Sequence, residues 1–302
     1  MEFDLIVIGS GPGGYKAAIT AAHLGARVAL IERDQPGGTC LNQGCVPKKT
    51  LVYLAALMED VNALNGHGLL GRVQGDFPAA LAHKDEVVAT IRKNFPVWLR
   101  RLGVRVFEGH GRLLAPHRVR VEGTGDEPVT LTGSRVILAT GSRPRPLDAC
   151  PTDGERIISS RDFMLTHQPL PGSMLFVGGG AIGCELGYLM NQFGAEVTIA
   201  EADERLLDRP GIPERASRML EDKLDRLGVT VRKGITVAQT RREGDGVEVT
   251  FSDGSRQSFE RVLVAIGREP LTDGLGLENA GIGPDQDGFI PVSEFAETET
   301  PD

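Results

Sequence analysis

Two cysteines five residues apart are the side chains in this sequence best suited to chemistry. Cys40 and Cys45 lie in residues 37–49, GGTCLNQGCVPKK. In an ideal helix this spacing separates the two Cα atoms by about 8 Å, whereas a disulfide usually needs them within about 7 Å. The backbone must therefore depart from a regular helix if the two residues are to pair, and Gly44 gives it the freedom to bend.

The cysteine pair has several interpretations. A strained, accessible disulfide is easily reduced and suits thiol–disulfide exchange. The two residues could instead be free thiols in a core, or an inert cross-link. A zinc site is a weaker alternative, because neither a CxxC pair nor a nearby His-x3-5-His pattern is present. The other two cysteines, Cys150 and Cys184, are expected to be isolated buried thiols.

Composition limits the class of protein. The 302 residues are 40% hydrophobic and 25% charged, which is typical of a soluble globular chain of two ordinary domains. The net charge of -8 argues against nucleic acid or an acidic membrane as a partner. No apolar run approaches the roughly 18 to 20 residues of a membrane span, and the N-terminus predicts a strand, not a signal peptide. We expect a reducing, cytoplasmic compartment, where a CxxxxC pair is more often catalytic than structural.

A strand–turn–helix unit precedes the cysteines. Residues 3–8 predict a buried strand, and an alanine-rich helix and a second strand ending in Glu32 follow. The turn between the first strand and the helix carries a GxGxxG pattern formed by Gly9, Gly11 and Gly14. This is the dinucleotide-binding fingerprint in its required context, where the glycines allow a tight turn, the approach of a pyrophosphate and close helix–strand packing. The helix N-terminus then faces the phosphates, and Glu32 accepts hydrogen bonds from a ribose.

The same unit occurs again later in the chain. With one constant shift, Gly9, Gly11, Gly14, Gly25, Ala26, Val28 and Glu32 fall on Gly178, Gly180, Gly183, Gly194, Ala195, Val197 and Glu201. Independent turns would rarely share seven positions, so we predict two nucleotide-binding units rather than structural glycines. Similar apolar strands, 136–141 and 262–267, close the two units.

Periodicity predicts the remaining elements. Between the units we expect helices and short strands at 48–64, 77–102, 105–108, 118–122 and 129–131. A proline-rich linker follows at 145–160. Beyond the second fingerprint we expect an amphipathic helix with a solvated face and four strands, at 213–227, 229–232, 235–241, 246–251 and 256–259.

These motifs resemble those of the FAD-dependent pyridine-nucleotide disulfide oxidoreductases, most closely the dihydrolipoamide dehydrogenases. The likeness covers essentially all of the chain and rests on residues 9–15, 37–47, 139–142, 178–185, 265–268 and 274–277. The CxxxxC run is specific to that family, whereas the nucleotide motifs are shared with many flavoproteins.

The resemblance implies an α/β fold with two Rossmann-like FAD/NAD(P)-binding domains of three ββα layers, the second inserted in the first. The predicted ranges are 1–148 for the FAD-binding domain with the redox CxxxxC, 149–269 for the NAD-binding domain and 270–302 for the start of a return segment. The family's aspartate motif and its C-terminal dimerisation domain, which carries a catalytic histidine, have no counterpart in the sequence. We therefore expect low turnover from this chain alone.

The resemblance also implies roles around the cysteines. Cys45 is expected nearest the flavin, and Cys40 is the outer thiol that meets the substrate. Lys49 is expected beside the flavin N5 and paired with Glu185, because a lysine there stabilises negative charge on reduced flavin and a carboxylate holds it in place. Lys48 stands where the family usually has serine, and we expect it to point into solvent.

The nucleotide-binding residues implied by the resemblance belong to both units. They are Gly9, Gly11, Gly14, Glu32, Gly38, Thr39, Lys49, Gly111, Thr140, Gly141, Ser142, Gly178, Gly180, Gly183, Glu201, Val237 and Gly267. Glu201 favours NAD, because a carboxylate accepts from the 2'-hydroxyl of NAD and repels the 2'-phosphate of NADP. Arg205 and Arg209 follow too far along the sequence to form a clear phosphate pocket. No metal site is expected.

The function that the resemblance implies is the oxidation of dihydrolipoamide to lipoamide with reduction of NAD. Electrons would pass from the dithiol to the cysteine pair, then to FAD, then to NAD. The implied partners are a lipoyl domain of a 2-oxo acid dehydrogenase complex or of the glycine cleavage system, and a second copy in a homodimer of the full-length protein. The alternatives are an NADPH-dependent disulfide or mercuric reductase and a catalytically silent nucleotide-binding module.

Overall fold

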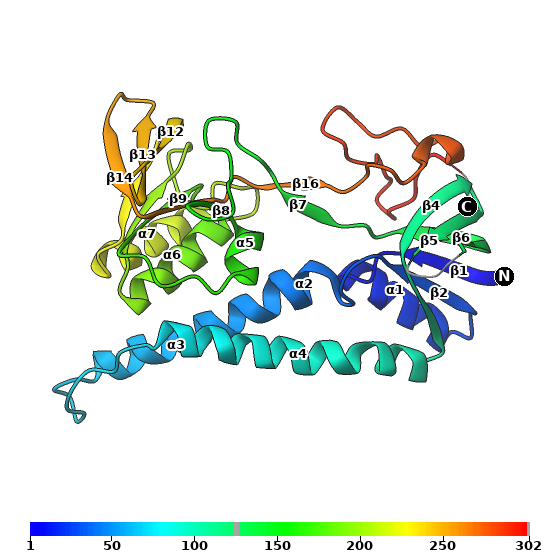
Figure 1. Cartoon of the computed structure of the whole chain (residues 1–302), viewed down its shortest axis with the longest axis horizontal. Coiled ribbons are helices and arrows are strands. Elements are labelled where there is room, and N and C mark those ends of the chain that lie inside the picture. The colour runs from blue at the N-terminus through cyan, green and yellow to red at the C-terminus, as the bar shows by residue number, and fades with distance from the viewer. Residues whose placement is uncertain (124–126, 301–302) are drawn as a thin grey trace. The chain divides into compact units, whose positions relative to one another are not determined.

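The computed structural model describes residues 1–123 and 127–300 and divides the chain into two compact units (Figure 1). The first unit comprises Met1–Val46, Val87–Arg143 and the residues from Glu269 onward. The second comprises Pro47–Glu86 and Pro144–Arg268, so it is inserted in the first. Residues 47–86, which the sequence had grouped with the first domain, belong to the second unit.

The first unit is built on a six-stranded sheet in the order β3-β2-β1-β6-β5-β4. The first four of these strands run parallel, and β5 and β4 continue the sheet antiparallel. Their bounds are β1 Glu2–Ile8, β2 Val28–Glu32, β3 Val104–Glu108, β4 His110–Ala115, β5 Arg118–Glu122 and β6 Val129–Leu138. The sequence predicted two separate strands in place of β6. One strand forms instead, and Gly133 within it lies against Ile6, where a Cβ would come within 2.8 Å of the Ile6 side chain.

Both faces of β1 are buried, as its apolar run predicts. On one face Leu5 and Val7 pack with side chains of α1 (Pro12–His23), α2 (Gly38–Gln43) and the second half of α4 (Phe77–Arg101). On the other face Ile6 and Ile8 join a cluster that reaches β4, β5 and the short helix η1 (Leu277–Ala280). The first fingerprint therefore starts at the end of a strand that is held on two sides.

The second unit has three layers, in agreement with the predicted fold class (Figure 1). Its central sheet is parallel, in the order β11-β10-β9-β15-β8. An antiparallel sheet, β12-β13-β14, covers one face through Val247, Val249 and Phe251. The strands are β8 Ile157–Ser159, β9 Ser173–Val177, β10 Glu196–Ala200, β11 Thr230–Arg232, β12 Val237–Glu243, β13 Gly246–Phe251, β14 Arg256–Phe259 and β15 Arg261–Val264.

Helices cover the other face of that central sheet. They are α3 (Cys45–Ala63) from Pro47 on, the first half of α4, α5 (Ser160–Leu165), α6 (Ala181–Phe193) and α7 (Glu214–Arg226). Met174 and Phe176 of β9 point into this helical layer, whereas Leu175 and Val177 point toward the antiparallel sheet. Residues 47–86 belong to the second unit because Leu51 and the side chains around it are part of this core.

A fourth, two-stranded sheet pairs β16 (Arg268–Pro270) with β7 (Ser142–Pro144). Within residues 1–123 and 127–300, no helix combines the length and the apolar character needed to cross a membrane.

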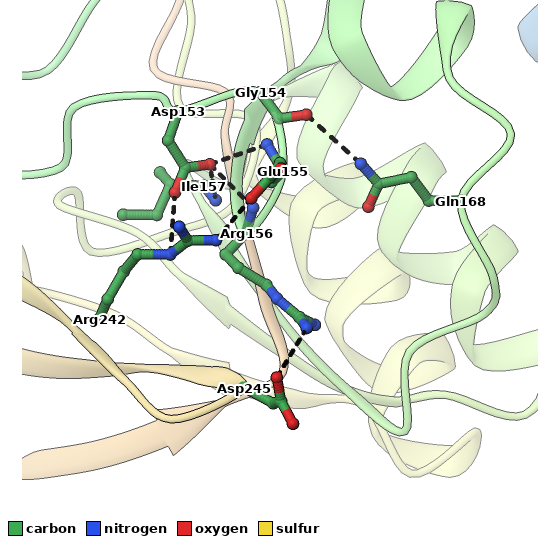
Figure 2. A network of polar contacts seen from close by, with 8 residues as sticks. All are labelled: Asp153, Gly154, Glu155, Arg156, Ile157, Gln168, Arg242 and Asp245. Atoms are coloured by element: carbon green, nitrogen blue, oxygen red, sulfur yellow. Dashed lines mark hydrogen bonds and ion pairs between the residues drawn. The ribbon is translucent and has the colours of Figure 1, made fainter.

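A charged network fixes the turn that leads into β8 of the second unit (Figure 2). One carboxylate oxygen of Asp153 accepts the backbone N–H groups of Glu155, Arg156 and Ile157 at 2.8–2.9 Å. Arg242 of β12 lies 3.5 Å from the other oxygen and donates to Glu155 at 2.8 Å. Burial alone would raise the pKa of Asp153, but the three N–H donors and Arg242 outweigh it and hold that pKa below its ordinary value.

We predict that Asp153→Asn removes a pH-dependent part of the stability of the second unit. The folded-state pKa is lowered, so the stabilisation is complete above the unfolded value near 3.8 and is lost as the pH falls through the folded value. At neutral pH we expect a loss of about 1 kcal/mol in the free energy of unfolding, because Asn keeps an acceptor but not the charge. Urea denaturation followed by circular dichroism at several pH values measures it.

The matched control is Asp245→Asn. Asp245 is fully exposed and pairs with Arg156 at 3.5 Å. Removal of its charge should therefore change the free energy of unfolding little at any pH. If the free energy of unfolding changed with pH in the same way for the wild type and for Asp153→Asn, the prediction would be contradicted.

Candidate functional site

Backbone atoms occupy the space around the first fingerprint. Gly9 has φ +103°, and a Cβ at this position would overlap the carbonyl oxygen of Ala139 at the end of β6. A Cβ on Gly14 would overlap the carbonyl oxygen of Gly9. Around Gly11, in contrast, nothing lies within 4 Å of where a Cβ would be. The turn is thus packed on the protein side and open at the glycine where a pyrophosphate approaches.

Glu32 holds this turn together. Its Oε2 accepts the backbone N–H of Ser10 at 2.9 Å and the Ser10 hydroxyl at 2.6 Å, and its Oε1 accepts the N–H of Asp34 at 2.8 Å. The Ser10 Oγ in turn accepts the N–H of Gly37 at 3.0 Å. The fingerprint pattern predicts only a ribose-binding role for Glu32. Its contacts show that it also ties β2, the fingerprint and the start of the cysteine segment to one another.

The cysteine segment packs directly on the first fingerprint. Gly38, which begins α2, has φ +59°, and a Cβ there would lie 2.7 Å from the Cα of Gly11. The helix ends at Gln43, Gly44 interrupts it, and α3 begins at Cys45. This interruption brings the Cα atoms of Cys40 and Cys45 to 4.6 Å, and the two residues form a disulfide. The expected departure from a regular helix at Gly44 is confirmed.

The disulfide narrows the alternatives for the cysteine pair. Neither residue is a free thiol, and among the described residues no cluster of three or more His, Cys, Asp or Glu side chains could hold a metal ion. Cys45 is exposed and Cys40 is half-buried, so the cross-link is within reach of a reactant. Cys45 is also the first residue of a 19-residue helix, and a helix N-terminus stabilises a thiolate.

The first unit has features that fit FAD. Gly11 leaves room for a pyrophosphate, and Gly111 of β4 is closely packed, since a Cβ there would lie 3.1 Å from the Ile8 side chain. Beside the disulfide, the side-chain nitrogen of Asn42 donates to the carbonyl groups of Gln35, Pro36 and Gly38. The buried Oδ1 of Asn42 has no hydrogen-bond partner among the described residues. An open phosphate approach and an unpaired acceptor are what a polar cofactor completes.

The second fingerprint repeats this geometry. Gly178 has φ +108°, and a Cβ there would lie 2.6 Å from the carbonyl oxygen of Ala265 at the end of β15. A Cβ on Gly183 would overlap the carbonyl oxygen of Gly178. Glu201 accepts the N–H of Gly179 at 2.5 Å and that of Asp203 at 3.0 Å, the same pair of contacts that Glu32 makes with Ser10 and Asp34. The repeat in the sequence is therefore a repeat in structure.

A cavity of about 290 Å³ lies on the second fingerprint, inside the second unit. Four of the predicted nucleotide-binding residues line it: Gly178, Gly180, Glu201 and Val237. Arg209 lines it as well, although sequence distance had argued against a phosphate contact there. Of the other predicted residues, Gly183 packs behind the turn and Gly267 takes a left-handed conformation after β15. These residues fit the adenosine and diphosphate portion of a nicotinamide dinucleotide.

The predicted partner of Glu185 is wrong. Lys48, not Lys49, forms the ion pair, with its Nζ 2.5 Å from Oε1 of Glu185. The Lys48 side chain is 20% exposed, whereas Lys49 is an exposed residue. The expectation that Lys48 points into solvent is therefore also wrong.

Helical periodicity contained the signal that identifies Lys48. The buried residues of α3 beyond Pro47 are Leu51, Ala55 and Met58, and Lys48 precedes them in the same phase. Lys49 is in phase with Tyr53, which is 65% exposed. Only Lys48 therefore lies on the face of α3 that packs in the second unit, where α6 carries Glu185.

The two remaining cysteines are buried free thiols, as expected. Burial raises the pKa of Cys150 to about 11. Burial first, and then the charges of Glu201 and Glu185, raise the pKa of Cys184 to about 12. Both thiols stay protonated near neutral pH, which leaves Cys40 and Cys45 as the redox pair.

Comparison with known proteins agrees with this geometry. The family model described as pyridine nucleotide-disulphide oxidoreductase matches residues 3–302. The dihydrolipoyl dehydrogenases of Chlamydia muridarum and Thermus scotoductus are 37% and 36% identical, each over 99% of this chain and 64% of the relative. The chain therefore spans 64% of the length of these curated relatives.

Two solved structures extend the comparison. The crystal structure of LpdA from Mycobacterium tuberculosis matches with a TM-score of 0.90 at 30% identity, over 98% of this chain and 65% of that one. The Cu(II) complex of the HOCl-induced flavoprotein disulfide reductase RclA from Escherichia coli matches with a TM-score of 0.85 at 28% identity, over 99% and 64%.

We predict that Gly44→Ala weakens the disulfide. A Cβ there would lie 3.0 Å from the carbonyl oxygen of Thr39 and 3.6 Å from the Cα of Cys40, in the turn that brings the sulfurs together. Such crowding costs about 1 to 3 kcal/mol, so the dithiol–disulfide equilibrium should move toward the dithiol by about 5- to 150-fold. Alkylation and mass spectrometry after equilibration in glutathione buffers measure it. Gly283→Ala, where nothing lies within 4 Å, should not move the equilibrium; equal values for both variants would refute the prediction.

The two lysines should also differ in their effect on stability. Lys48→Gln leaves Glu185 without its partner and should lower the free energy of unfolding by about 1 kcal/mol, the upper end for a partly exposed pair. Lys49→Gln should stay within about 0.5 kcal/mol of wild type. Thermal unfolding of both variants tests this, and a larger loss for Lys49→Gln would restore the original pairing.

Proposed function

The chain belongs to the pyridine nucleotide-disulphide oxidoreductase family, and on that premise we propose that it takes part in the FAD-dependent oxidation of dihydrolipoamide with reduction of NAD. The observation that carries the proposal is the accessible Cys40–Cys45 disulfide, packed through Gly38 on the first of two dinucleotide fingerprints. Its relatives named dihydrolipoyl dehydrogenase support the choice of substrate.

We assign FAD to the first unit and NAD to the second. The residues that would hold FAD are the glycines and Glu32 of the first turn, with Gly38, Thr39, Gly111 and residues 140–142. The flavin supplies the capacity to take two electrons from a dithiol and to release them as hydride. Glu201 and the cavity beside it support NAD over NADP, because carboxylates at the ribose end repel a 2'-phosphate.

The disulfide exchange is written with the roles that the family resemblance assigns, Cys40 as the thiol that meets the substrate and Cys45 as the thiol nearest the flavin. A substrate thiolate attacks the sulfur of Cys40, the Cys40–Cys45 bond breaks, and Cys45 leaves as a thiolate. Cys45 begins α3, and the partial positive charge of a helix N-terminus stabilises a departing thiolate there. The second substrate thiolate then attacks the substrate sulfur of the mixed disulfide and releases Cys40. The substrate loses two electrons and two protons, and the protein disulfide gains the two electrons.

Lys48 is the candidate for the charged pair with Glu185 that the family places beside its flavin. The pair lies on α3 and α6 of the second unit, with 20% of the Lys48 side chain and 43% of the Glu185 side chain exposed. The nucleotide-binding role of Lys49 stays a prediction.

The proposed partners are a lipoyl domain that presents the dithiol and a second copy of the full-length protein. A lipoyl-bearing 2-oxo acid dehydrogenase complex or glycine cleavage system would supply the domain. The proposed compartment is the cytoplasm, and the proposed cellular role is redox homeostasis.

An NADPH-dependent disulfide or metal-ion reductase of the same family is the second candidate. It is favoured by the structural likeness to the disulfide reductase RclA, and it uses the same cysteine pair in the opposite direction. A silent nucleotide-binding module is a third reading, against which the paired, accessible cysteines speak.

The decisive experiment is an anaerobic titration of the FAD-loaded chain with dihydrolipoamide, followed by visible absorbance. We expect reduction of the flavin spectrum with a long-wavelength thiolate-to-flavin band. Cys45→Ser should abolish thiol-dependent reduction, because no disulfide remains to accept the substrate electrons. Cys150→Ser, which changes a buried thiol outside the pair, should behave as wild type.

Reoxidation of the reduced chain then separates the candidates. Faster reoxidation by NAD than by NADP supports the dehydrogenase. Preference for NADP points to the reductase. Equal behaviour of Cys45→Ser and wild type leaves only the binding module.

A further inference from the structure

Arg209 lies beside the middle glycine of the second fingerprint. One of its terminal guanidinium nitrogens is 3.5 Å from the position that a Cβ would take on Gly180, and no other heavy atom outside the immediate chain neighbours comes within 4 Å of that position. Both residues line the cavity of the second unit. Gly180 is the position at which a pyrophosphate approaches the backbone, so the guanidinium lies beside the place where phosphate oxygens are expected.

An ion pair and several hydrogen bonds hold the loop that carries Arg209. Arg205 pairs with Asp208 at 2.5 Å and donates to the carbonyl oxygen of Ile212 at 3.1 Å. The N–H of Leu206 donates to Glu221 at 3.2 Å, and the N–H of Leu207 donates to the carbonyl oxygen of Gly179 at 3.0 Å. The loop is therefore attached to both α7 and the fingerprint.

Leu207 shows that this loop is held under strain. Its φ of +54° is in the left-handed region, which residues other than glycine rarely adopt. The conformation persists because the Leu207 N–H is bound to Gly179. Residues in such conformations concentrate at ligand sites, and Leu207 itself lines the cavity.

The charges of the cavity are unevenly satisfied. Asp208 is neutralised by Arg205, and Glu201 accepts two backbone N–H groups. Asp203, an exposed carboxylate that follows Glu201, lines the cavity as well. Arg209 is exposed, and within the described part of the chain its guanidinium has no ion-pair or hydrogen-bond partner. The cavity thus presents one unpaired cation beside Gly180 and the Glu201 carboxylate at the end of β10. An anion next to a neutral ribose diol complements this pattern.

We propose that Arg209 is a binding residue that contacts the pyrophosphate of the dinucleotide at Gly180, while Glu201 rejects a phosphate on the ribose 2'-position. This inference rests on the proposed nucleotide site of the second unit. A guanidinium can bond two phosphate oxygens at once, and its positive charge adds to the attraction of the backbone N–H groups at the helix N-terminus.

Calorimetric titration of the full chain with adenosine, ADP-ribose and 2'-phospho-ADP-ribose tests the proposal. Arg209→Gln should weaken ADP-ribose binding about 10- to 100-fold, because a charged hydrogen-bond donor is lost. Its affinity for adenosine should be unchanged, since adenosine has no phosphate. Arg209→Lys should recover part of the loss, and added salt should weaken ADP-ribose binding more in wild type than in Arg209→Gln.

Arg215→Gln is the matched control. Arg215 is an exposed arginine at the start of α7 in the same unit and does not line the cavity. Equal ADP-ribose affinities for Arg209→Gln and Arg215→Gln would overturn the role of Arg209 and leave the nucleotide site standing. Equal losses for adenosine and ADP-ribose would show that the change only disturbs the loop.

Two further outcomes separate a failure of the pyrophosphate contact from a failure of the nucleotide site itself. Tighter binding of 2'-phospho-ADP-ribose, lost in Arg209→Gln, would reassign the arginine to a 2'-phosphate and overturn the pyrophosphate contact. A wild-type chain with native circular dichroism that binds neither ADP-ribose nor NADH would overturn both this inference and the proposed function of the second unit.

Discussion

The close approach of one glycine carbonyl to another glycine fixes both turns of this protein. The carbonyl oxygens of Gly9 and Gly178 occupy the space in which Gly14 and Gly183 would carry a Cβ. Each approach lets a helix begin directly behind a buried strand and leaves Gly11 or Gly180 open to a ligand. The carboxylates of Glu32 and Glu201 then close the turns from the next strand. The cysteine segment is attached to the first turn through Ser10 and Gly38, and the loop that carries Arg209 is attached to the second through Gly179.

The two fingerprint turns and several strands were predictable from the sequence because each is specified by residues close together in the chain. A GxGxxG pattern between a strand and a helix needs few neighbours to be recognised, and its repetition made two units a secure prediction. Strands β13 and β14 have the predicted bounds, and in β13 the alternation of Val247, Val249 and Phe251 follows from one buried face. Elements with weak patterns of their own, such as the three-residue strand β8 and the short helix α5, were not predicted.

The wrong predictions, for the partner of Glu185 and for Arg209, concern contacts between segments that are distant in the sequence. The pairing of Lys48 with Glu185 depends on which face of α3 enters the second core, and a family motif alone does not show that face. The phase of Leu51 would have shown it. Arg209 was set aside because it is far from Glu201 in sequence, yet the loop returns through the contact of Leu207 with Gly179 and places it beside Gly180. No local pattern contains that return.

The residue after the first glycine distinguishes the two turns. In the first turn it is Ser10, whose hydroxyl donates to Glu32 and accepts from Gly37, so the fingerprint is fastened to the cysteine segment. In the second turn it is Gly179, where a side chain would overlap Leu206 and lie 2.9 Å from Glu201. The absence of that side chain admits the loop that carries Arg209. One scaffold thus carries a redox disulfide in one unit and a cationic loop in the other, and the residue after the first glycine contacts the attached segment in each.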